Sequence, residues 1–126
     1  MNENEISKIV MNDAIKVHKT LGPGLLESVY QRCMEYELTK SGLFVECEKI
    51  LPVIYNRIKL PSGYRIDILV ENKVIVEIKS VENIHDIHKA QLLTYLKLSG
   101  CKLGLLMNFN VTYIGLGVKR LINGTI

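Results

Sequence analysis

The chain has 126 residues, 48% of them apolar, and a formal net charge of only +3. This length and composition predict one domain over residues 1–126 with a single core. The charge permits a nucleic-acid partner without arguing for one. No apolar run approaches the roughly 20 residues that a membrane-spanning helix needs, so no membrane association is expected.

Three cysteines lie far apart in the sequence, at Cys33, Cys47 and Cys101. Because none of them forms a CxxC pair, they fit reduced thiols better than a disulfide framework, a zinc site or an iron–sulfur site. The N-terminal segment MNENEISKIV is polar and acidic, unlike a signal peptide. We therefore expect a soluble protein of the cytoplasm.

Two helices are predicted before any strand. Apolar residues recur at helical spacing over about residues 4–20. LGPG (21–24) interrupts this pattern, because proline between two glycines is a strong turn signal. A second helix then runs from Gly24 or Leu25 to about Lys40, where Ser-Gly stops it.

Strand-forming residues follow. FVECEKILPVIY (44–55) is typical of one extended strand, with an edge or a bend at Pro52. In RIKLPSGYRIDILV (57–70), PSG lies between two short strands and predicts a hairpin turn. KVIVEIKS (73–80) is the next strand, after a short polar break.

Residues 85–98 return to helical spacing, and Gly100 ends that helix. KLGLLMNF (102–109) is a further strand, and VKRLI (118–122) is a candidate for a short last one. Two strands joined through a helix favour a right-handed crossover and a parallel pair. The sequence therefore predicts an α/β fold with a mixed β-sheet flanked by helices.

Side chains alternate between the two faces of a strand, and the two strands around residue 71 each show one apolar stripe. We expect both stripes to lie on the same face, under a helix. This shared apolar face would hold Tyr64, Ile66, Ile68, Val70, Val74, Val76 and Ile78.

Asp67, Glu77 and Lys79 would then share the opposite face of these two strands. A three-residue loop (71–73) places Asp67 opposite Glu77. A two-residue loop would put the two acids on different faces unless a bulge intervenes. We predict the longer loop or a bulge.

Two carboxylates that face each other repel and share protons unless a cation lies between them. Hard oxygen ligands suit Mg²⁺ or Mn²⁺ at roughly 2.0–2.2 Å, and the backbone carbonyl of Ile78 could add a third oxygen. A lysine beside such a site can orient an attacking water or stabilise a phosphate, so Asp67, Glu77 and Lys79 suit metal-assisted phosphodiester hydrolysis. The alternative is a solvated strand face with cross-strand ion pairs.

Helical residues add candidates. If Gly24 is an N-cap, Glu27 is at N3 and stabilises its helix; alternatively Glu27 adds a carboxylate or holds a metal-bound water. Gln91 and Tyr95 lie four residues apart and share a helix face with His88. These residues either form a polar stripe in water, or Gln91 reaches the metal or a phosphate while Tyr95 stacks nearby.

Basic residues are candidates for contacts to the phosphates of a nucleic acid. Solvated surface is the alternative for each of them. The set consists of Arg57, Lys59, Arg65, Lys119 and Arg120.

The segment GLLESVY, with Gly24, Glu27 and Tyr30, matches a GxxExxY pattern. The chain resembles the GxxExxY proteins, a group within the PD-(D/E)xK nuclease superfamily. The resemblance extends over nearly the whole chain, through GYRIDILVENKVIVEIKSVE, HKAQLLTYLKLSG and LGLLMNFN in that order. It implies the restriction-endonuclease-like αβββαβ core, which agrees with the elements predicted above.

The resemblance implies a role for each matched position. Asp67 and Glu77 stand at the first and second acids of the motif, Lys79 stands at its lysine, and Glu27 matches the acid of the preceding helix. The proline that gives the superfamily its name is absent, since Ile66 precedes Asp67.

Gln91 and Tyr95 match the QxxxY helix motif of the RecB-like branch. Some members of that branch bind an iron–sulfur cluster through four cysteines. This chain has three cysteines without suitable spacing, so no cluster is expected.

The resulting hypothesis is a Mg²⁺- or Mn²⁺-dependent nuclease that acts on DNA. The metal site would consist of Asp67, Glu77, the Ile78 carbonyl and Glu27. Lys79 and Gln91 would assist catalysis, and a separate set of side chains would contact the nucleic acid. A homodimer or a larger assembly is compatible with this size. The alternatives are a catalytically silent module that binds nucleic acid or protein, and a purely structural subunit. The nucleic-acid contacts would come from Arg65, Tyr95, Lys119 and Arg120.

Overall fold

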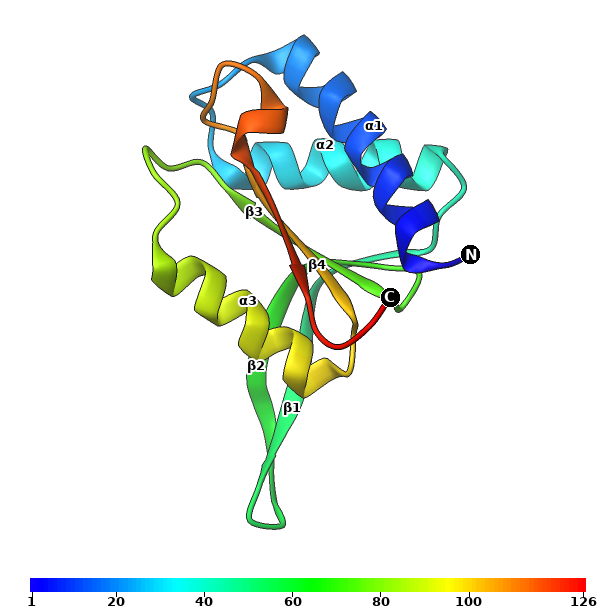
Figure 1. The fold of residues 1–126 in the computed structure, drawn as a ribbon, viewed down its shortest axis with the longest axis vertical. Helices are drawn as coiled ribbons and strands as arrows, with labels where there is room; N and C mark the ends of the chain where they lie inside the picture. The colour runs from blue at the N-terminus through cyan, green and yellow to red at the C-terminus, as the bar shows by residue number, and fades with distance from the viewer.

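The computed structural model describes residues 1–126, in which helices cover both faces of one five-stranded sheet (Figure 1). Helices α1 (Glu3–Leu21) and α2 (Glu27–Lys40) pack on one face, and α3 (Asp86–Ser99) packs on the other. None of these helices has both the length and the apolar character that crossing a bilayer requires. The remaining elements are β1 (Val45–Tyr55), β2 (Ile58–Val70), β3 (Val74–Lys79), β4 (Leu103–Asn108), the 3-10 helix η1 (Ile114–Gly117) and β5 (Val118–Ile122).

The strands lie in the order β1-β2-β3-β4-β5. Strands β3 and β4 are parallel, as predicted from the helix that joins them, and every other neighbouring pair is antiparallel. The mixed sheet flanked by helices is thus confirmed, and α2-β1-β2-β3-α3-β4 gives the αβββαβ order. The three expected helices and the short last strand are present, but the two short strands expected on either side of PSG form one strand, β2.

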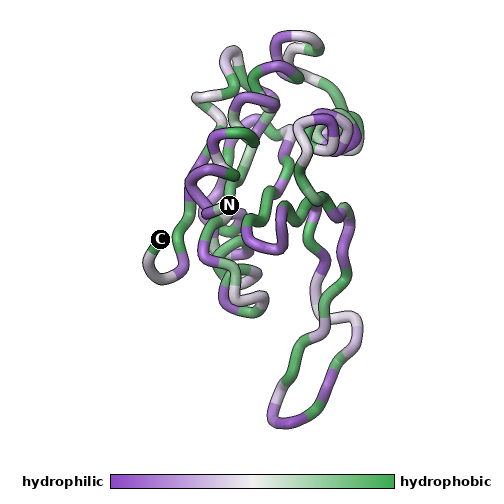
Figure 2. Tube along the Cα trace, turned by 90° about the vertical axis from the view of Figure 1, so that its right-hand side faces the viewer, coloured by the Kyte–Doolittle hydropathy of each residue, from purple (hydrophilic) through white to green (hydrophobic).

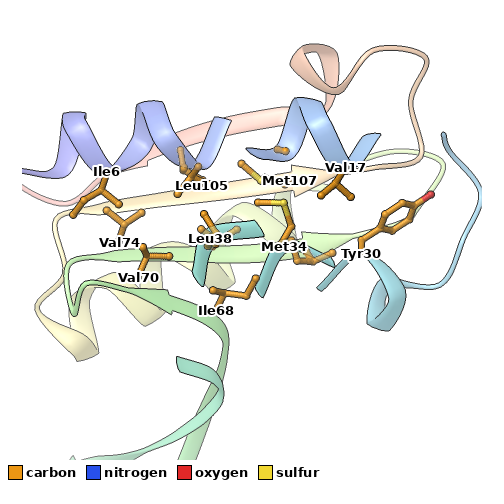
Figure 3. Packing of buried hydrophobic residues seen from close by; sticks show 14 of the residues in the cluster. Ile6, Val17, Tyr30, Met34, Leu38, Ile68, Val70, Val74, Leu105 and Met107 are labelled. Carbon is orange, nitrogen blue, oxygen red and sulfur yellow. The ribbon is translucent and has the colours of Figure 1, made fainter. Parts of the chain in front are cut away.

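The larger core lies between the sheet and the helices α1 and α2 (Figure 3). Helix α1 begins with a capping box, in which the Asn2 side chain accepts from the Glu5 N–H and the Glu5 carboxylate accepts from the Asn2 N–H. Its inner face repeats at helical spacing and is fully buried through Ile6, Val10 and Ala14. The larger of these side chains, Ile6 and Val10, each contribute about 1.5–3 kcal/mol of hydrophobic stabilisation.

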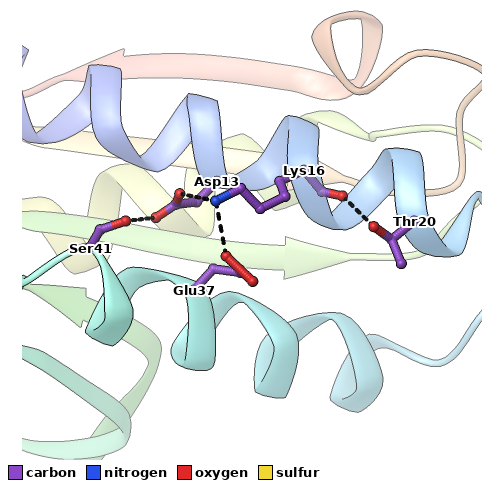
Figure 4. A network of polar contacts seen from close by, with 5 residues as sticks. All are labelled: Asp13, Lys16, Thr20, Glu37 and Ser41. Atoms are coloured by element: carbon purple, nitrogen blue, oxygen red, sulfur yellow. Dashed lines mark hydrogen bonds and ion pairs between the residues drawn. The ribbon is translucent and has the colours of Figure 1, made fainter.

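A polar network joins α1 to α2 at the edge of this core (Figure 4). The buried carboxylate of Asp13 accepts a hydrogen bond from the Ser41 hydroxyl at 2.7 Å. Lys16 Nζ lies 3.3 Å from Glu37 Oε2, and it also reaches Asp13 at 4.0 Å. The network therefore sets the two helices side by side through charge as well as packing.

The smaller core lies under α3 on the opposite face of the sheet. Leu92 and Leu96 of α3 are fully buried there against Ile75 and Leu106. Gly104 lets the helix approach closely, because a Cβ at this position would lie 2.9 Å from the nearest methyl carbon of Leu92. Gly100 ends α3 with a left-handed backbone at φ +79°, as expected.

The hairpin turn between β1 and β2 differs from the prediction. The turn is Asn56-Arg57, with φ of +47° and +69°, and not PSG (61–63). PSG lies inside β2, where the pairing shifts between Leu51 and Val53 of the facing strand. Proline and glycine are found at bulges within strands as well as in turns, and in this chain PSG forms a bulge.

The apolar stripe of β2 also changes face, which the sequence analysis did not predict. Ile68 and Val70 pack in the core under α1 and α2, whereas Ile66 packs under α3. The change falls at Asp67, opposite the irregular residue Glu48, whose φ is +52°. Strict alternation fails because the backbone is no longer regularly pleated at this point.

Candidate active site

Asp67 and Glu77 meet near the end of the β2–β3 ladder. The pairs Ile68–Val76 and Val70–Val74 leave residues 71–73 as the loop. The three-residue loop is therefore confirmed, and the same register places Asp67 opposite Glu77. We call these two residues the acidic pair.

Each acid of the pair is held by the backbone of the other strand. The N–H of Asp67 donates to Glu77 Oε2 at 2.8 Å, and the N–H of Ile78 donates to Asp67 Oδ2 at 2.9 Å. Side chains thus replace the backbone ladder where β2 changes face. Glu77 is only 4% exposed, whereas Asp67 is half-buried, so the pair lies at the boundary between core and solvent.

The electrostatics of the acidic pair disfavour two negative charges. Burial, followed by the neighbouring charge of Asp67, raises the pKa of Glu77 to about 8. The positive charge of Lys79 acts in the opposite direction. A cation bound between the two carboxylates would remove this repulsion.

Lys79 lies two residues beyond Glu77, at the carboxyl end of β3. Its half-buried side chain takes part in none of the ion pairs of the structure, so the ammonium is available to a ligand. The main chain here is firmly held, because Lys79 pairs with Asn108 of β4 and its carbonyl accepts from the Phe109 N–H at 2.9 Å.

Asn108 is a positioning residue that was not among the candidates predicted from the sequence. Its side-chain amide is buried, accepts from the Val81 N–H at 3.1 Å and donates to the Val81 carbonyl at 2.9 Å. This clasp fixes the chain just after Lys79. A polar residue at the end of the otherwise apolar strand LGLLMN was the signal that could have revealed it.

Glu27 lies at the end of β3, next to the residue that follows Lys79, and its position within α2 differs from the one expected. Helix α2 begins at Glu27 with Leu26 as N-cap, so Glu27 is at N1 and the predicted N3 capping position is wrong. Its Oε2 accepts from the N–H of Ser80 at 3.0 Å, and the Ser80 hydroxyl donates to the Leu25 carbonyl at 2.7 Å. The start of α2 is thereby fastened to the end of β3.

Tyr30, the last residue of GLLESVY, is fully buried and stacks on Phe109 with a centroid distance of 4.5 Å. Its hydroxyl donates to the Gly22 carbonyl at 2.6 Å and accepts from the Leu25 N–H at 3.1 Å. Tyr30 therefore holds the turn before α2, and through it the position of Glu27.

Helix α3 contributes an aromatic side chain close to the acidic pair. Burial, and then the charges of Glu77 and Asp67, raise the pKa of Tyr95. The Tyr95 ring lies against that of Tyr64, with centroids 5.0 Å apart. Gln91, one turn earlier, is exposed and its side-chain amide makes no hydrogen bond within the chain, so the structure does not bring that amide onto the carboxylates.

His88 serves its helix. Its Nδ1 accepts from the N–H of His85 at 3.0 Å, at the first turn of α3.

The basic candidates divide between the two faces of the sheet. Arg65 is exposed, and its positive charge acts to lower the pKa of Tyr95, against the effect of the two acids. Lys119 pairs with Leu106, which pairs in turn with Glu77, so Lys119 shares the face of Glu77. Arg120 lies on the other face, where its guanidinium donates to the side chains of Asn4 and Ser7. The expected grouping of Arg120 with the other cations is therefore wrong, because adjacent residues of a strand point to opposite faces.

The donor chemistry of the acidic pair fits a hard divalent cation. The Ile78 N–H is directed toward β2, and the carbonyl of a strand residue points to the same side as its N–H, so the Ile78 carbonyl faces the pair. No set of three His, Cys, Asp or Glu side chains is arranged to hold a metal ion, so Glu27 does not complete a three-carboxylate set. Mg²⁺ commonly uses one or two carboxylates and fills its other positions with water and phosphate.

Comparison with known proteins gives one match. A family model described as the PD-(D/E)XK nuclease superfamily matches residues 4–121. No curated protein and no solved structure matches the chain. The matched segment runs from the first turn of α1 into β5 and includes the acidic pair and Lys79.

Proposed function

Because the chain belongs to the PD-(D/E)XK nuclease superfamily, we propose that it is a divalent-metal-dependent nuclease that hydrolyses phosphodiester bonds in DNA. The observation that carries this proposal is the acidic pair, with Glu77 buried and Asp67 half-buried, beside a lysine without an ion pair at the carboxyl end of the central strand β3. Family membership supports a metal-dependent nuclease in general, whereas the DNA substrate and the site residues are our own assignment.

In this proposal, Asp67, Glu77 and the Ile78 carbonyl hold Mg²⁺ or Mn²⁺. When bound, such an ion polarises the phosphate and lowers the pKa of a coordinated water. The Lys79 ammonium orients the attacking water or stabilises charge on the phosphate. Glu27 acts from outside the pair by fixing Ser80, directly after Lys79.

Gln91 and Tyr95 are assigned to the substrate side of the site. Tyr95 is close enough to the acidic pair for the charges of both acids to raise its pKa. Gln91 lies on the same helix, and its side-chain amide has no partner within the chain. Arg65 and Lys119 are assigned to phosphate contacts, and Arg120 is left out because it is engaged on the other face.

We further assign the chain to the GxxExxY group and to the RecB-like branch. The buried Tyr30 and the contact of Glu27 with Ser80 give the first motif a structural purpose at this site. The QxxxY spacing of Gln91 and Tyr95 supports the second assignment. A cytoplasmic location is proposed because all three cysteines are free thiols.

A second candidate function is a binding module that keeps the nuclease scaffold without catalysis. A fold does not fix an activity, so the scaffold is equally compatible with such a module. The two functions differ in the fate of the nucleic acid: a nuclease cuts it, and a silent module only retains it.

The deciding experiment incubates the purified chain with single-stranded, duplex and branched DNA in the presence of Mn²⁺ or Mg²⁺. We expect cleavage that falls about 100-fold or more in Lys79→Ala and in Asp67→Ala. The matched control is Lys102→Ala, an exposed lysine of the turn before β4. Cleavage that survives both active-site substitutions would indicate contamination, and binding without cleavage would support the silent module.

A further inference from the structure

The β1–β2 hairpin extends well beyond the rest of the sheet, and no helix covers its end (Figures 1 and 2). We call residues 52–63, which lie beyond the Leu51–Tyr64 pair, the arm. A two-stranded ribbon without a core is marginal in water, and its apolar side chains remain exposed. The large exposed apolar residues of the arm, between 48% and 72% accessible, are Ile54, Tyr55, Ile58 and Leu60.

The arm and its base carry charge of one sign. Between Ile50 and Arg65 the sequence contains three basic residues, Arg57, Lys59 and Arg65, and no acidic residue, while Lys49 just before this segment is paired with Glu46. The rest of the chain is mixed in sign, so this segment concentrates positive charge on one projecting ribbon. A polyanion complements such a surface, whereas the arm of a second copy would meet it with the same sign.

Arg57 occupies an unusual position at the tip of the arm. Asn56 and Arg57 both have the left-handed backbone that a type I′ turn requires, with φ of +47° and +69°. The second position of this turn favours glycine, and a long side chain there is strained. The arrangement holds a guanidinium at the farthest point of the ribbon, beside the pairs Ile54–Lys59 and Tyr55–Ile58.

We propose that the arm binds duplex nucleic acid, with Arg57 and Lys59 on phosphates and the apolar tip in a groove. A two-stranded ribbon fits the major groove, and apolar side chains can also insert at base steps. The inference rests on the proposed function only in that the acidic pair would receive the same duplex.

The arm also sets a length scale. Asp67 lies ten residues from Arg57 along β2. At roughly 3.3 Å per residue, the tip reaches about 30 Å from the acidic pair. This distance is close to one helical turn of B-DNA, about 34–36 Å. A bound duplex should therefore be gripped about one turn from the position offered to the acidic pair.

The test is binding without cleavage, measured by fluorescence anisotropy on a labelled DNA duplex in the presence of a chelator. We expect Arg57→Gln with Lys59→Gln to bind at least tenfold more weakly and to lower the slope of log K against log salt by about 2. The control is Lys8→Gln with Lys19→Gln on α1, which removes the same charge far from the arm and should keep the slope.

Two further variants separate binding from folding. Arg57→Gly relieves the turn, so it should raise the unfolding temperature while weakening binding. Replacing residues 52–63 by Asn-Gly should abolish the preference for duplexes longer than one helical turn over shorter ones. Loss of binding in a variant that is more stable than the wild type cannot arise from unfolding.

Unchanged affinity and salt slope in the arm variants would overturn the proposal, as would a wild-type chain that binds no duplex. If the variants instead convert a dimer into a monomer in sedimentation and leave binding intact, the tip is a self-association surface and the proposal is wrong. The nuclease question stays separate. If the arm variants bind more weakly but the wild type cleaves no DNA, the proposed nuclease activity is wrong and the proposed binding of duplex by the arm still stands.

Discussion

Lys79 and Asn108 lie side by side on the parallel strands β3 and β4, and each is bonded to the segment that follows the other. The Lys79 carbonyl accepts from the N–H of Phe109, and the Asn108 amide binds both polar groups of the Val81 main chain. The carboxyl ends of these strands are thereby locked together, which fixes the direction from which Lys79 approaches the acidic pair.

Removing this lock should lower the stability of the chain. Asn108→Ala leaves the N–H of Val81 without its partner, so we expect a loss of about 2–3 kcal/mol in the free energy of unfolding. Urea denaturation measures it. Asn110→Ala is the matched control, since Asn110 gives Val81 only one bond, at 3.3 Å. An equal loss in both variants would contradict the role given to Asn108.

Glu77 should make stability depend on pH in a direction unusual for an acid. The pKa of Glu77 is raised from its ordinary value to about 8, so between those values the folded chain holds a proton that the unfolded chain releases. Stability from this group is full at acidic pH and is lost as the pH rises through 8. In chelator, the wild type should lose more stability than Glu77→Gln between pH 5 and pH 8.9, by up to a few kcal/mol.

The control for this pH dependence is Glu82→Gln, an exposed acid of the loop that follows β3. It should reproduce the wild-type difference between the two pH values. A wild-type curve parallel to that of Glu77→Gln would show that the acidic pair is not electrostatically strained.

The polar network between α1 and α2 should depend on Lys16. Glu37 Oε2 is buried without a hydrogen bond, and Lys16 Nζ is the cation beside it at 3.3 Å. Lys16→Met should destabilise the chain by about 1–3 kcal/mol, because it leaves a carboxylate without its counter-charge. Lys16→Met with Glu37→Gln should recover part of that loss in thermal unfolding. An additive double variant would refute the coupling.

Cys47 should react slowly with alkylating reagents in the folded chain. Burial, followed by the charge of Glu35, raises the pKa of its thiol to about 12, so little thiolate is present at neutral pH. Alkylation with iodoacetamide followed by peptide mass mapping should find Cys47 unmodified until the chain is unfolded. Rapid labelling of native Cys47 would contradict a thiol that is shielded by burial and by the charge of Glu35.

The sequence was sufficient for the parts of the fold that follow from periodicity. Helical spacing located α1 and α3, and the helix between two strands predicted the parallel pair β3–β4. The loop length followed from requiring Asp67 and Glu77 to meet, because a slip of one residue would have separated them.

The remaining features depend on backbone conformation that residue types do not reveal. Glu48 and Arg57 adopt positive φ without being glycine, and these two residues mark the face change at Asp67 and the true hairpin turn. Likewise, nothing in VKRLI indicated which of Lys119 and Arg120 lies on the same face of the sheet as Glu77, because the register of β5 on β4 decides it.

Calorimetric titration of the metal-free chain with Mn²⁺ tests the central claim most directly. We predict one site whose affinity falls at least tenfold in Asp67→Asn and in Glu77→Gln, with protons released on binding near neutral pH because Glu77 must ionise. Heats indistinguishable from dilution, or binding that both substitutions leave unchanged, would contradict a metal site at the acidic pair.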